Sequence, residues 1–263
     1  MSQQQKHYQQ HYDHSIADPE AFWALQARNV AWYQAPRQTL QTLADGTHRW
    51  FADGQLNSSY LALDYQIEQG RGEQTALIYD SPVSHSKVRY SYNELRDEVA
   101  RLAGLLRQLG VEKGDGVIIY MPMVPQAAMA MLACARLGAI HSVVFGGFAA
   151  HELALRIDDS KPKLLLTASC GLEFDRVIEY KPLVDKALEL ARHQPSHVLV
   201  LQRPQVQAQL QKGRDLDWSA ALVGVQPVDP VPVASTDPLY IMYTSGTTGR
   251  PKGIVRENGG NAV

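Results

Sequence analysis

The chain has 263 residues, of which 45% are hydrophobic and 20% charged, a composition typical of a soluble globular protein. Its formal net charge is −2, and its 25 basic residues are scattered, so we expect neither nucleic acid nor a membrane surface as a partner. No segment resembles a targeting peptide, and the longest apolar stretch, 127–135, is too short to span a bilayer. Cys134 and Cys170 lie in apolar stretches and indicate buried free thiols. We therefore expect a cytoplasmic location.

The first third of the chain predicts one helix followed by irregular chain. Asp18 can cap a helix that begins with Pro19. Periodicity fades over 36–63 while aromatic residues recur, which indicates an extended segment against a larger body. The polar stretch 66–74 suggests a boundary, and we divide the chain there into 1–66 and 67–263.

From residue 75 onward, short apolar runs alternate with helical patterns. This alternation predicts an α/β fold with a largely parallel sheet flanked by helices, because the apolar runs do not alternate with polar residues and so suit strands buried on both faces. The Pro- and Val-rich piece 226–238 is expected to be a surface connection. The expected strands are 75–79, 116–120, 140–145, 164–168, 198–201 and 239–243, and the expected helices are 92–109, 125–137, 150–159 and 183–192.

The helix at 92–109 has the strongest local signals. Ser91 and Glu94 have the spacing of a capping box. Apolar residues then follow the helical period to Leu109, and Gly110 stands where a left-handed C-terminal cap belongs.

A loop rich in glycine and hydroxyl groups follows the last expected strand. Its glycines allow close backbone approach to a ligand, its amides can form an anion-binding concavity, and Lys252 adds a positive charge. These features predict a site for the phosphates of ATP. The spacing differs from a Walker A loop, and the alternative is a flexible linker or hairpin turn. The candidate phosphate-binding residues are Thr244, Ser245, Gly246, Thr247, Thr248, Gly249 and Lys252.

This loop resembles the signature of the adenylate-forming superfamily, which includes acyl-CoA synthetases, luciferase-like enzymes and peptide-synthetase adenylation domains. The resemblance implies that the loop holds the β- and γ-phosphates of ATP while a carboxylate attacks the α-phosphate. The CoA thiol would then displace AMP from the acyl adenylate. In relatives the catalytic lysine, the acyl pocket and the Mg²⁺-linked acidic residue lie at positions that would fall beyond Val263. We therefore expect this chain alone to be inactive.

Further residues resemble the short-chain branch, which contains the acetyl- and propionyl-CoA synthetases. They are 121–123, 132–148 and the aromatic pairs Phe22-Trp23 and Trp50-Phe51. The resemblance makes 1–66 an N-terminal extension of the acetyl-CoA synthetase type and 67–263 the first part of an AMP-binding domain. The residues at 254–260 resemble propionate–CoA ligases. An acetyl-CoA synthetase, another adenylating enzyme or a non-catalytic ATP- and CoA-binding remnant remain alternatives.

In this branch the CoA nucleotide lies against a Phe-Gly-Gly turn, here Phe145, Gly146 and Gly147. Two arginines of the branch approach the CoA phosphates. One falls on Arg176, whereas Glu173 stands in place of the other. The alternative is a strand-end turn with two core aromatic residues.

Three other residues are given structural roles. His141 is expected to be a satisfied histidine, and Asp158 and Asp159 to form a solvated helix end rather than a metal site. The sequence shows neither metal-ligand spacing nor a catalytic triad.

Overall fold

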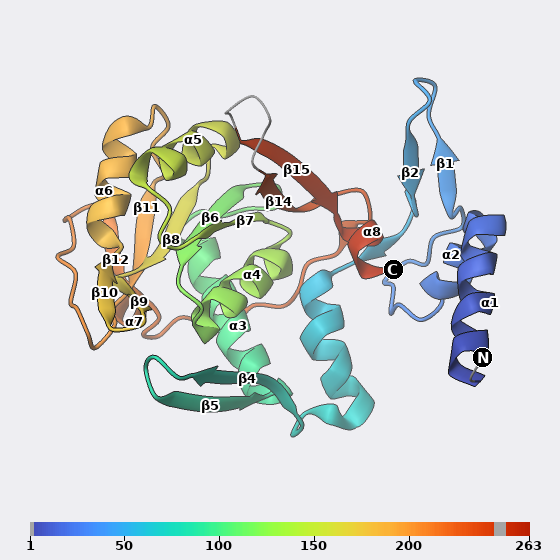
Figure 1. The fold of residues 1–263 in the computed structure, drawn as a ribbon, viewed down its shortest axis with the longest axis horizontal. Helices are drawn as coiled ribbons and strands as arrows, with labels where there is room; N and C mark the ends of the chain where they lie inside the picture. The colour runs from blue at the N-terminus through green and yellow to red at the C-terminus, as the bar shows by residue number, and fades with distance from the viewer. Residues whose placement is uncertain (1–2, 245–250) are drawn as a thin grey trace.

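A seven-stranded sheet forms the centre of the molecule in the computed structural model, which describes residues 3–244 and 251–263 (Figure 1). Its strand order is β12-β11-β8-β6-β7-β14-β15, and every neighbouring pair is parallel except the antiparallel β14–β15 pair. The predicted fold class is thereby confirmed. The strands are β6 (Gly116–Met121), β7 (Ile140–Phe145), β8 (Leu164–Ala168), β11 (His197–Leu201), β12 (Asp215–Asp217), β14 (Pro238–Thr244) and β15 (Lys252–Glu257).

Helices cover both faces of this sheet and produce two cores. Strand β6 shows why: Val117 and Ile119 pack into one core, and Ile118 and Tyr120 into the other. Side chains alternate across a strand, so a strand buried on both faces must be apolar throughout. The first core is covered by α3 (Tyr92–Gln108) and α4 (Pro125–Leu137), and the second by α5 (Ala150–Ser160) and α6 (Lys181–Leu190).

Helix α3 begins and ends as its sequence predicts. The Ser91 hydroxyl accepts a hydrogen bond from the backbone N–H of Glu94, and the Glu94 carboxylate accepts one from the N–H of Ser91. Gly110 has φ of +85°, a left-handed conformation that glycine adopts without strain. Both expectations are confirmed.

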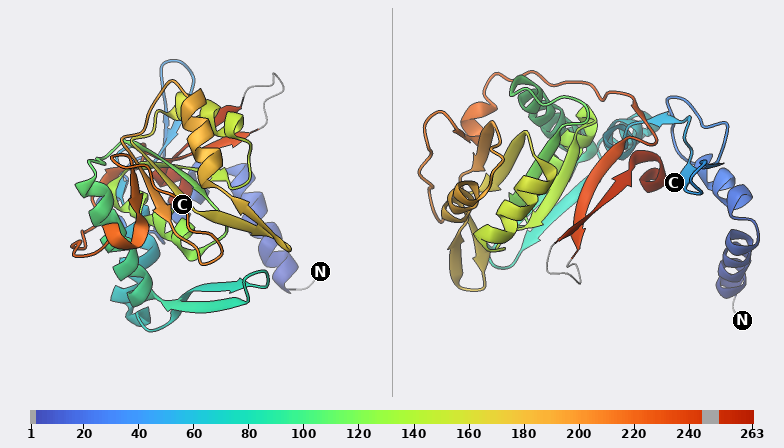
Figure 2. Two further views of the ribbon diagram at one scale, coloured as in Figure 1. Left: turned by 90° about the vertical axis from the view of Figure 1, so that its left-hand side faces the viewer. Right: turned by 90° about the horizontal axis from the view of Figure 1, so that it is seen from above.

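The N-terminal region differs from the expected single helix, because α1 (Gln3–Ala17) precedes α2 (Pro19–Ala27). Asp18 does cap α2, accepting from the N–H of Ala21 at 3.0 Å. Helix α1 is polar on most sides and offers little apolar periodicity from which to predict it. Figure 2 shows that it lies at one end of the molecule. The elements that follow are β1 (Leu40–Thr42), β2 (His48–Trp50), β3 (Gln55–Leu56) and the π-helical segments η1 (Tyr60–Asp64) and η2 (Ile67–Arg71).

Several short elements were not predicted. Strand β4 was predicted, but its partner β5 and strand β10 contain no buried residue, so the alternation of apolar and polar residues in these two strands is weak. These elements are β5 (Ser86–Ser91), which pairs with β4 (Thr75–Ser81), β9 (Cys170–Glu173), β10 (Arg176–Glu179), α7 (Trp218–Ala221), β13 (Val233–Ala234) and α8 (Asn258–Ala262).

The expected surface connection at 226–238 is partly wrong. Val233 and Ser235 are buried, and β13 pairs with β3 in the N-terminal extension. Proline-rich composition suggested exposure, but the valines between the prolines provide apolar side chains that this segment packs inward.

A buried ion pair joins the N-terminal extension to the α/β body. The side chain of Arg136, at the end of α4, is 2% exposed, and its two terminal nitrogens donate to Asp64 of η1 at 2.7 and 2.9 Å. Its Nε donates to the carbonyl of Val228 at 2.6 Å. Beside it, the buried Asn57 amide donates to the carbonyls of Ala135 and Val231. One polar cluster therefore ties together three segments that are distant in sequence.

Replacing Arg136 with methionine should lower the free energy of unfolding by about 3–5 kcal/mol, because Asp64 would keep a partly buried charge without its partner. Urea denaturation of the intact protein measures this loss. Arg37→Met is the matched control, since Arg37 pairs with Asp53 at the surface, where such pairs contribute about 1 kcal/mol or less. Equal losses in the two variants would contradict the role assigned to Arg136.

Candidate functional site

Three parallel strands end at the same edge of the sheet. Strands β6, β7 and β14 end at Met121, Phe145 and Thr244. Tyr240 pairs with His141 in the parallel β7–β14 register, so Thr244 and Phe145, each four residues further on, reach this edge together. Ligands of open α/β sheets bind beyond the carboxyl ends of the strands. This edge is therefore the candidate site.

The β14–β15 hairpin carries the candidate phosphate loop at this edge. Thr244 and Lys252 are cross-strand partners at its end, and both side chains are exposed. The hairpin thus places a hydroxyl and an ammonium group side by side. The other predicted phosphate-binding residues, Ser245, Gly246, Thr247, Thr248 and Gly249, lie outside the described residues, and the function of the set stays a prediction.

Helix α5 contacts the loop end of this hairpin through Tyr243. The Tyr243 hydroxyl donates to Asp159 at 2.6 Å, and the guanidinium of Arg156 lies 5.4 Å from the centre of the tyrosine ring. Burial, and then the hydrogen bond to Asp159, raise the pKa of Tyr243 well above its usual value. Tyr243 is thus a neutral donor at any physiological pH.

The glycine turn after β7 forms the second part of the edge. Phe145 is 64% exposed, as an aromatic platform must be. Gly147 has φ of +118°, which a side chain would disfavour. The Tyr120 hydroxyl lies beneath the turn, donating to the Phe148 carbonyl at 2.8 Å and accepting from the Gly147 N–H at 3.3 Å.

Gly146 is required here for space. A Cβ on Gly146 would lie 2.5 Å from the Tyr180 ring and 2.8 Å from the Met121 carbonyl oxygen. Tyr180 is buried, and its burial raises its pKa to about 12. The same tyrosine would clash with a Cβ on Gly171 in β9. Tyr180 therefore fixes the glycine turn and the β9–β10 hairpin against each other.

The β9–β10 hairpin brings Arg176 to the glycine turn, together with Glu173. The two residues are cross-strand partners with a 3.4 Å contact between their charged groups. A Cβ on Gly147 would lie 3.9 Å from Glu173 Oε1. The predicted CoA-binding residues Phe145, Gly146, Gly147 and Arg176 are therefore gathered in one place, and a carboxylate is gathered with them. Their role in binding CoA stays a prediction.

The Asp158–Asp159 pair stands in the last turn of α5 with Asp159 exposed, as expected of a helix end, but both carboxylates also accept hydrogen bonds. Asp158 accepts the backbone N–H groups of Arg192 and His193, and Asp159 accepts from Tyr243. Helix periodicity could have paired Arg156 and Asp159 on one side of α5, but only the tertiary structure shows what they contact.

His141 also differs from the expectation of a satisfied histidine. It is buried in β7, and its Nδ1 has no hydrogen-bond partner among the described residues. Burial lowers its pKa to about 4, so the ring is neutral. It packs against Tyr240, with ring centres 5.6 Å apart.

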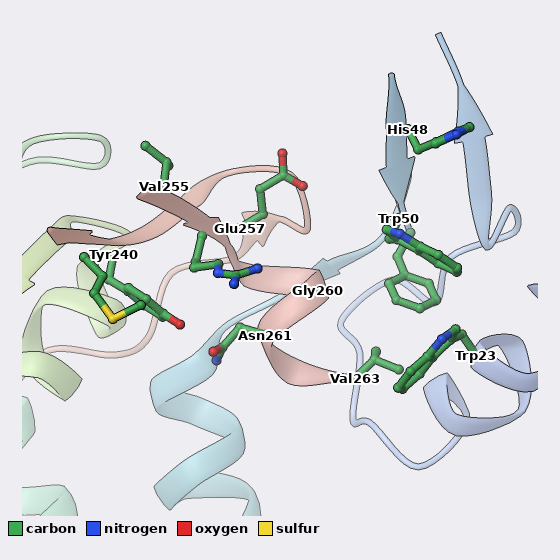
Figure 3. Close-up of a pocket in the computed structure, with 12 residues that line it drawn as sticks. Trp23, His48, Trp50, Tyr240, Val255, Glu257, Gly260, Asn261 and Val263 are labelled. Carbon is green, nitrogen blue, oxygen red and sulfur yellow. The ribbon is translucent and has the colours of Figure 1, made fainter. Parts of the chain in front are cut away.

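A hollow of about 650 Å³ lies away from this edge, between the N-terminal extension and the β14–β15 hairpin. Figure 3 shows Trp23 and Trp50 on its extension side and Tyr240 and Val255 on the opposite side. Burial raises the pKa of Glu257, which also lines it. The strand-end edge remains the better candidate, because it gathers the hydroxyl, lysine and glycine-turn groups that suit phosphates.

Within 3–244 and 251–263, no three His, Cys, Asp or Glu side chains are grouped to hold a metal ion. Over the same residues, no helix has the length and apolar character to cross a bilayer.

The parallel sheet with helices on both faces is an open α/β fold, the class in which ligands bind beyond the carboxyl ends of the strands. The family model "AMP-binding enzyme" matches residues 63–263, and "Acetyl-coenzyme A synthetase N-terminus" matches 8–62. The chain belongs to the AMP-binding enzyme family, with an N-terminus of the acetyl-CoA synthetase type. The predicted family is thereby confirmed, while the domain boundary at 66/67 stays a prediction.

Named relatives cluster in the short-chain branch. The chain is 50% identical to human "Acyl-CoA synthetase short-chain family member 3, mitochondrial" over 97% of its length and 38% of the relative. It is 44% identical to "Propionate--CoA ligase" of Escherichia coli over 96% of its length and 40% of the relative. The structure of acetoacetyl-CoA synthetase from Streptomyces lividans matches with a TM-score of 0.83 and 28% identity, over 94% of this chain and 38% of that one. The chain thus spans about two fifths of these proteins.

Replacing Gly146 with alanine should cost about 1–3 kcal/mol of stability, because the added methyl group meets a backbone oxygen and a buried ring. Thermal unfolding of the intact protein measures this. Gly260→Ala is the control, since a Cβ there meets no atom within 4 Å. An unchanged melting temperature for Gly146→Ala would show that Tyr180 does not restrain the turn.

Proposed function

We propose that the protein containing this chain is a short-chain acid–CoA ligase that joins propionate to CoA through an acyl adenylate made from ATP. The observation that carries the proposal is the pairing of Thr244 with Lys252 at the strand ends, beside the exposed Phe145 turn. One edge of the sheet thus offers a place for ATP phosphates next to a place for a second nucleotide.

Two observations support the short-chain acid as substrate. The named relatives are a short-chain acyl-CoA synthetase and a propionate–CoA ligase. The residues after the loop, with Arg256 and Asn258, resemble the propionate type. Acetate is the second candidate acid, because the N-terminal family model carries the acetyl-CoA synthetase name. ATP, CoA and a short acid are the proposed small-molecule partners.

The loop acts in the first half-reaction. When the carboxylate attacks the α-phosphate, negative charge grows on the departing pyrophosphate. The ammonium of Lys252 and the hydroxyl of Thr244 are proposed to stabilise that charge, because groups aimed at developing charge lower the barrier. Mg²⁺ is proposed to accompany ATP, with its ligands outside the residues that the structure describes.

The glycine turn acts in the second half-reaction. An exposed aromatic face at Phe145 suits stacking with adenine, and Gly147, where a Cβ would meet no atom nearer than 3.8 Å, leaves the backbone open to close approach by a nucleotide. Arg176 offers a positive charge for a phosphate, which Glu173 partly offsets at 3.4 Å. Because both half-reactions need the same bound adenylate, the proximity of loop and turn supports one site for both.

A cytoplasmic location is also part of the proposal, supported by the two buried free thiols Cys134 and Cys170, which suit a reducing compartment. The human relative is named as mitochondrial, a description that applies to that protein.

Replacing Lys252 with alanine in the intact enzyme should slow adenylation about 10²–10³-fold, by analogy with other single electrostatic donors. Its contribution is greatest in the transition state, so kcat should fall more than KM rises. Acid-dependent ATP–pyrophosphate exchange measures this step. Lys87→Ala is the control, because Lys87 pairs with Asp80 on the distant β4–β5 hairpin.

Thioester formation from preformed acyl adenylate should change far less in Lys252→Ala. The proposal for the loop would be overturned if exchange stayed intact while thioester formation failed.

The intact enzyme should prefer propionate to acetate by about 10–200-fold in kcat/KM, since one methylene in an apolar pocket contributes about 1–3 kcal/mol. Measured rates of AMP release with each acid test this. A preference for acetate would assign the protein to the acetyl-CoA synthetases instead.

A further inference from the structure

Arg156 occupies an unusual place between the two loops of the candidate site. Both cation–π contacts found among the described residues belong to it: its guanidinium carbon lies 5.1 Å from the ring centre of Phe148 and 5.4 Å from that of Tyr243. Phe148 ends the glycine turn, and Tyr243 immediately precedes Thr244. One charged group therefore contacts both loops at their bases.

Contacts within α5 hold the Arg156 guanidinium independently of the two rings. Its side chain is 8% exposed, and Nη1 donates to the Glu152 carboxylate at 2.8 Å and to the Glu152 carbonyl at 2.6 Å. Both Arg156 and Glu152 belong to α5, so the guanidinium is held relative to that helix. A cation desolvated over an aromatic face binds it more strongly than an exposed one does.

The same helix holds Tyr243 at a second point. Asp159, three residues after Arg156, accepts the tyrosine hydroxyl at 2.6 Å. The tyrosine ring is thus restrained at its face and at its oxygen. Phe148 is restrained at its face by Arg156 and at its carbonyl by Tyr120.

We propose that Arg156 is a positioning residue that couples the glycine turn to the loop end of the β14–β15 hairpin, so that the turn and the Thr244–Lys252 pair hold their positions only together. This rests on the proposed function, in which the turn receives CoA and the loop receives ATP. The coupling would align the thiol of CoA with the adenylate left by ATP. In this proposal Arg156 acts through Phe148 and Tyr243.

The first test uses hydrogen–deuterium exchange on the intact protein and needs no activity. In Arg156→Met, backbone exchange should rise together in residues 145–149 and 252–255, by about 5-fold or more, the lower end of coupling between sites. Arg214→Met is the matched control, because Arg214 is a partly buried arginine that pairs with Asp185 and Asp215 away from both loops. A rise in only one segment, or equal rises in both variants, would overturn the coupling.

The second test measures coupling in the reaction. Phe148→Leu should slow acid-dependent ATP–pyrophosphate exchange about 5-fold or more, although Phe148 belongs to the CoA turn. In an Arg156→Met background the same change should add little, since the connection is already lost. If the effects of the two substitutions on the rate of ATP–pyrophosphate exchange were fully additive, the proposal would be overturned. Arg156→Lys, which keeps the charge but not the planar group, should give intermediate rates.

The two hypotheses fail in different ways. If the unsubstituted protein shows no ATP–pyrophosphate exchange with any short acid, the proposed function fails. The hydrogen–deuterium exchange result still decides the coupling in that case. If the unsubstituted protein shows normal ATP–pyrophosphate exchange, but Arg156→Met behaves like Arg214→Met in both tests, only the coupling fails.

Discussion

The ion pair between Arg136 and Asp64 is the constraint on which the arrangement of the chain depends. A buried guanidinium can be tolerated only where its donors are satisfied, and here the partners come from the extension and from the segment before β13. Burial of this arginine therefore requires that both segments be in place. The segment that satisfies it leads through β13 into β14, the strand that precedes the candidate phosphate loop. The N-terminal extension is consequently part of the framework that positions the site, although none of its residues is proposed to contact ATP.

The candidate site combines a rigid base with exposed groups at its rim. Tyr120 and Tyr180 lie buried beneath the glycine turn, while Phe145 and Arg176 stand exposed above it. This division separates stability from binding: the tyrosines set the backbone path through packing and hydrogen bonds, and the rim remains free to contact a ligand. Glu173 introduces a negative charge into a rim that is proposed to receive phosphates. In the proposed CoA site, the affinity should therefore depend on the balance between Glu173 and Arg176 more than on either charge alone.

Local chemistry allowed much of the fold to be predicted from the sequence. The capping box at Ser91, the limits of α4 and the apolar runs of β6 and β8 depend on neighbouring residues, so the sequence carries their signal. Strand β10, which has no buried residue, and the polar helix α1 lack an apolar period. For the site, glycines and hydroxyls pointed to the candidate loop and turn, whose binding roles stay predictions. Arg156, Asp159 and Tyr180 were not identified, because their roles come from contacts across long sequence separations that a single sequence does not reveal.

The place of β14 in the sheet has a consequence for how the protein is made. Its parallel partner, β7, leaves the ribosome about a hundred residues earlier, as the pairing of His141 with Tyr240 requires. At about 5–20 residues per second, β7 waits roughly 5–20 s for this neighbour. During that interval its edge is open to pairing with other chains, the hazard that any uncovered strand presents. Translation speed through this stretch, and chaperones that shield the nascent β7, should therefore govern the yield of active protein.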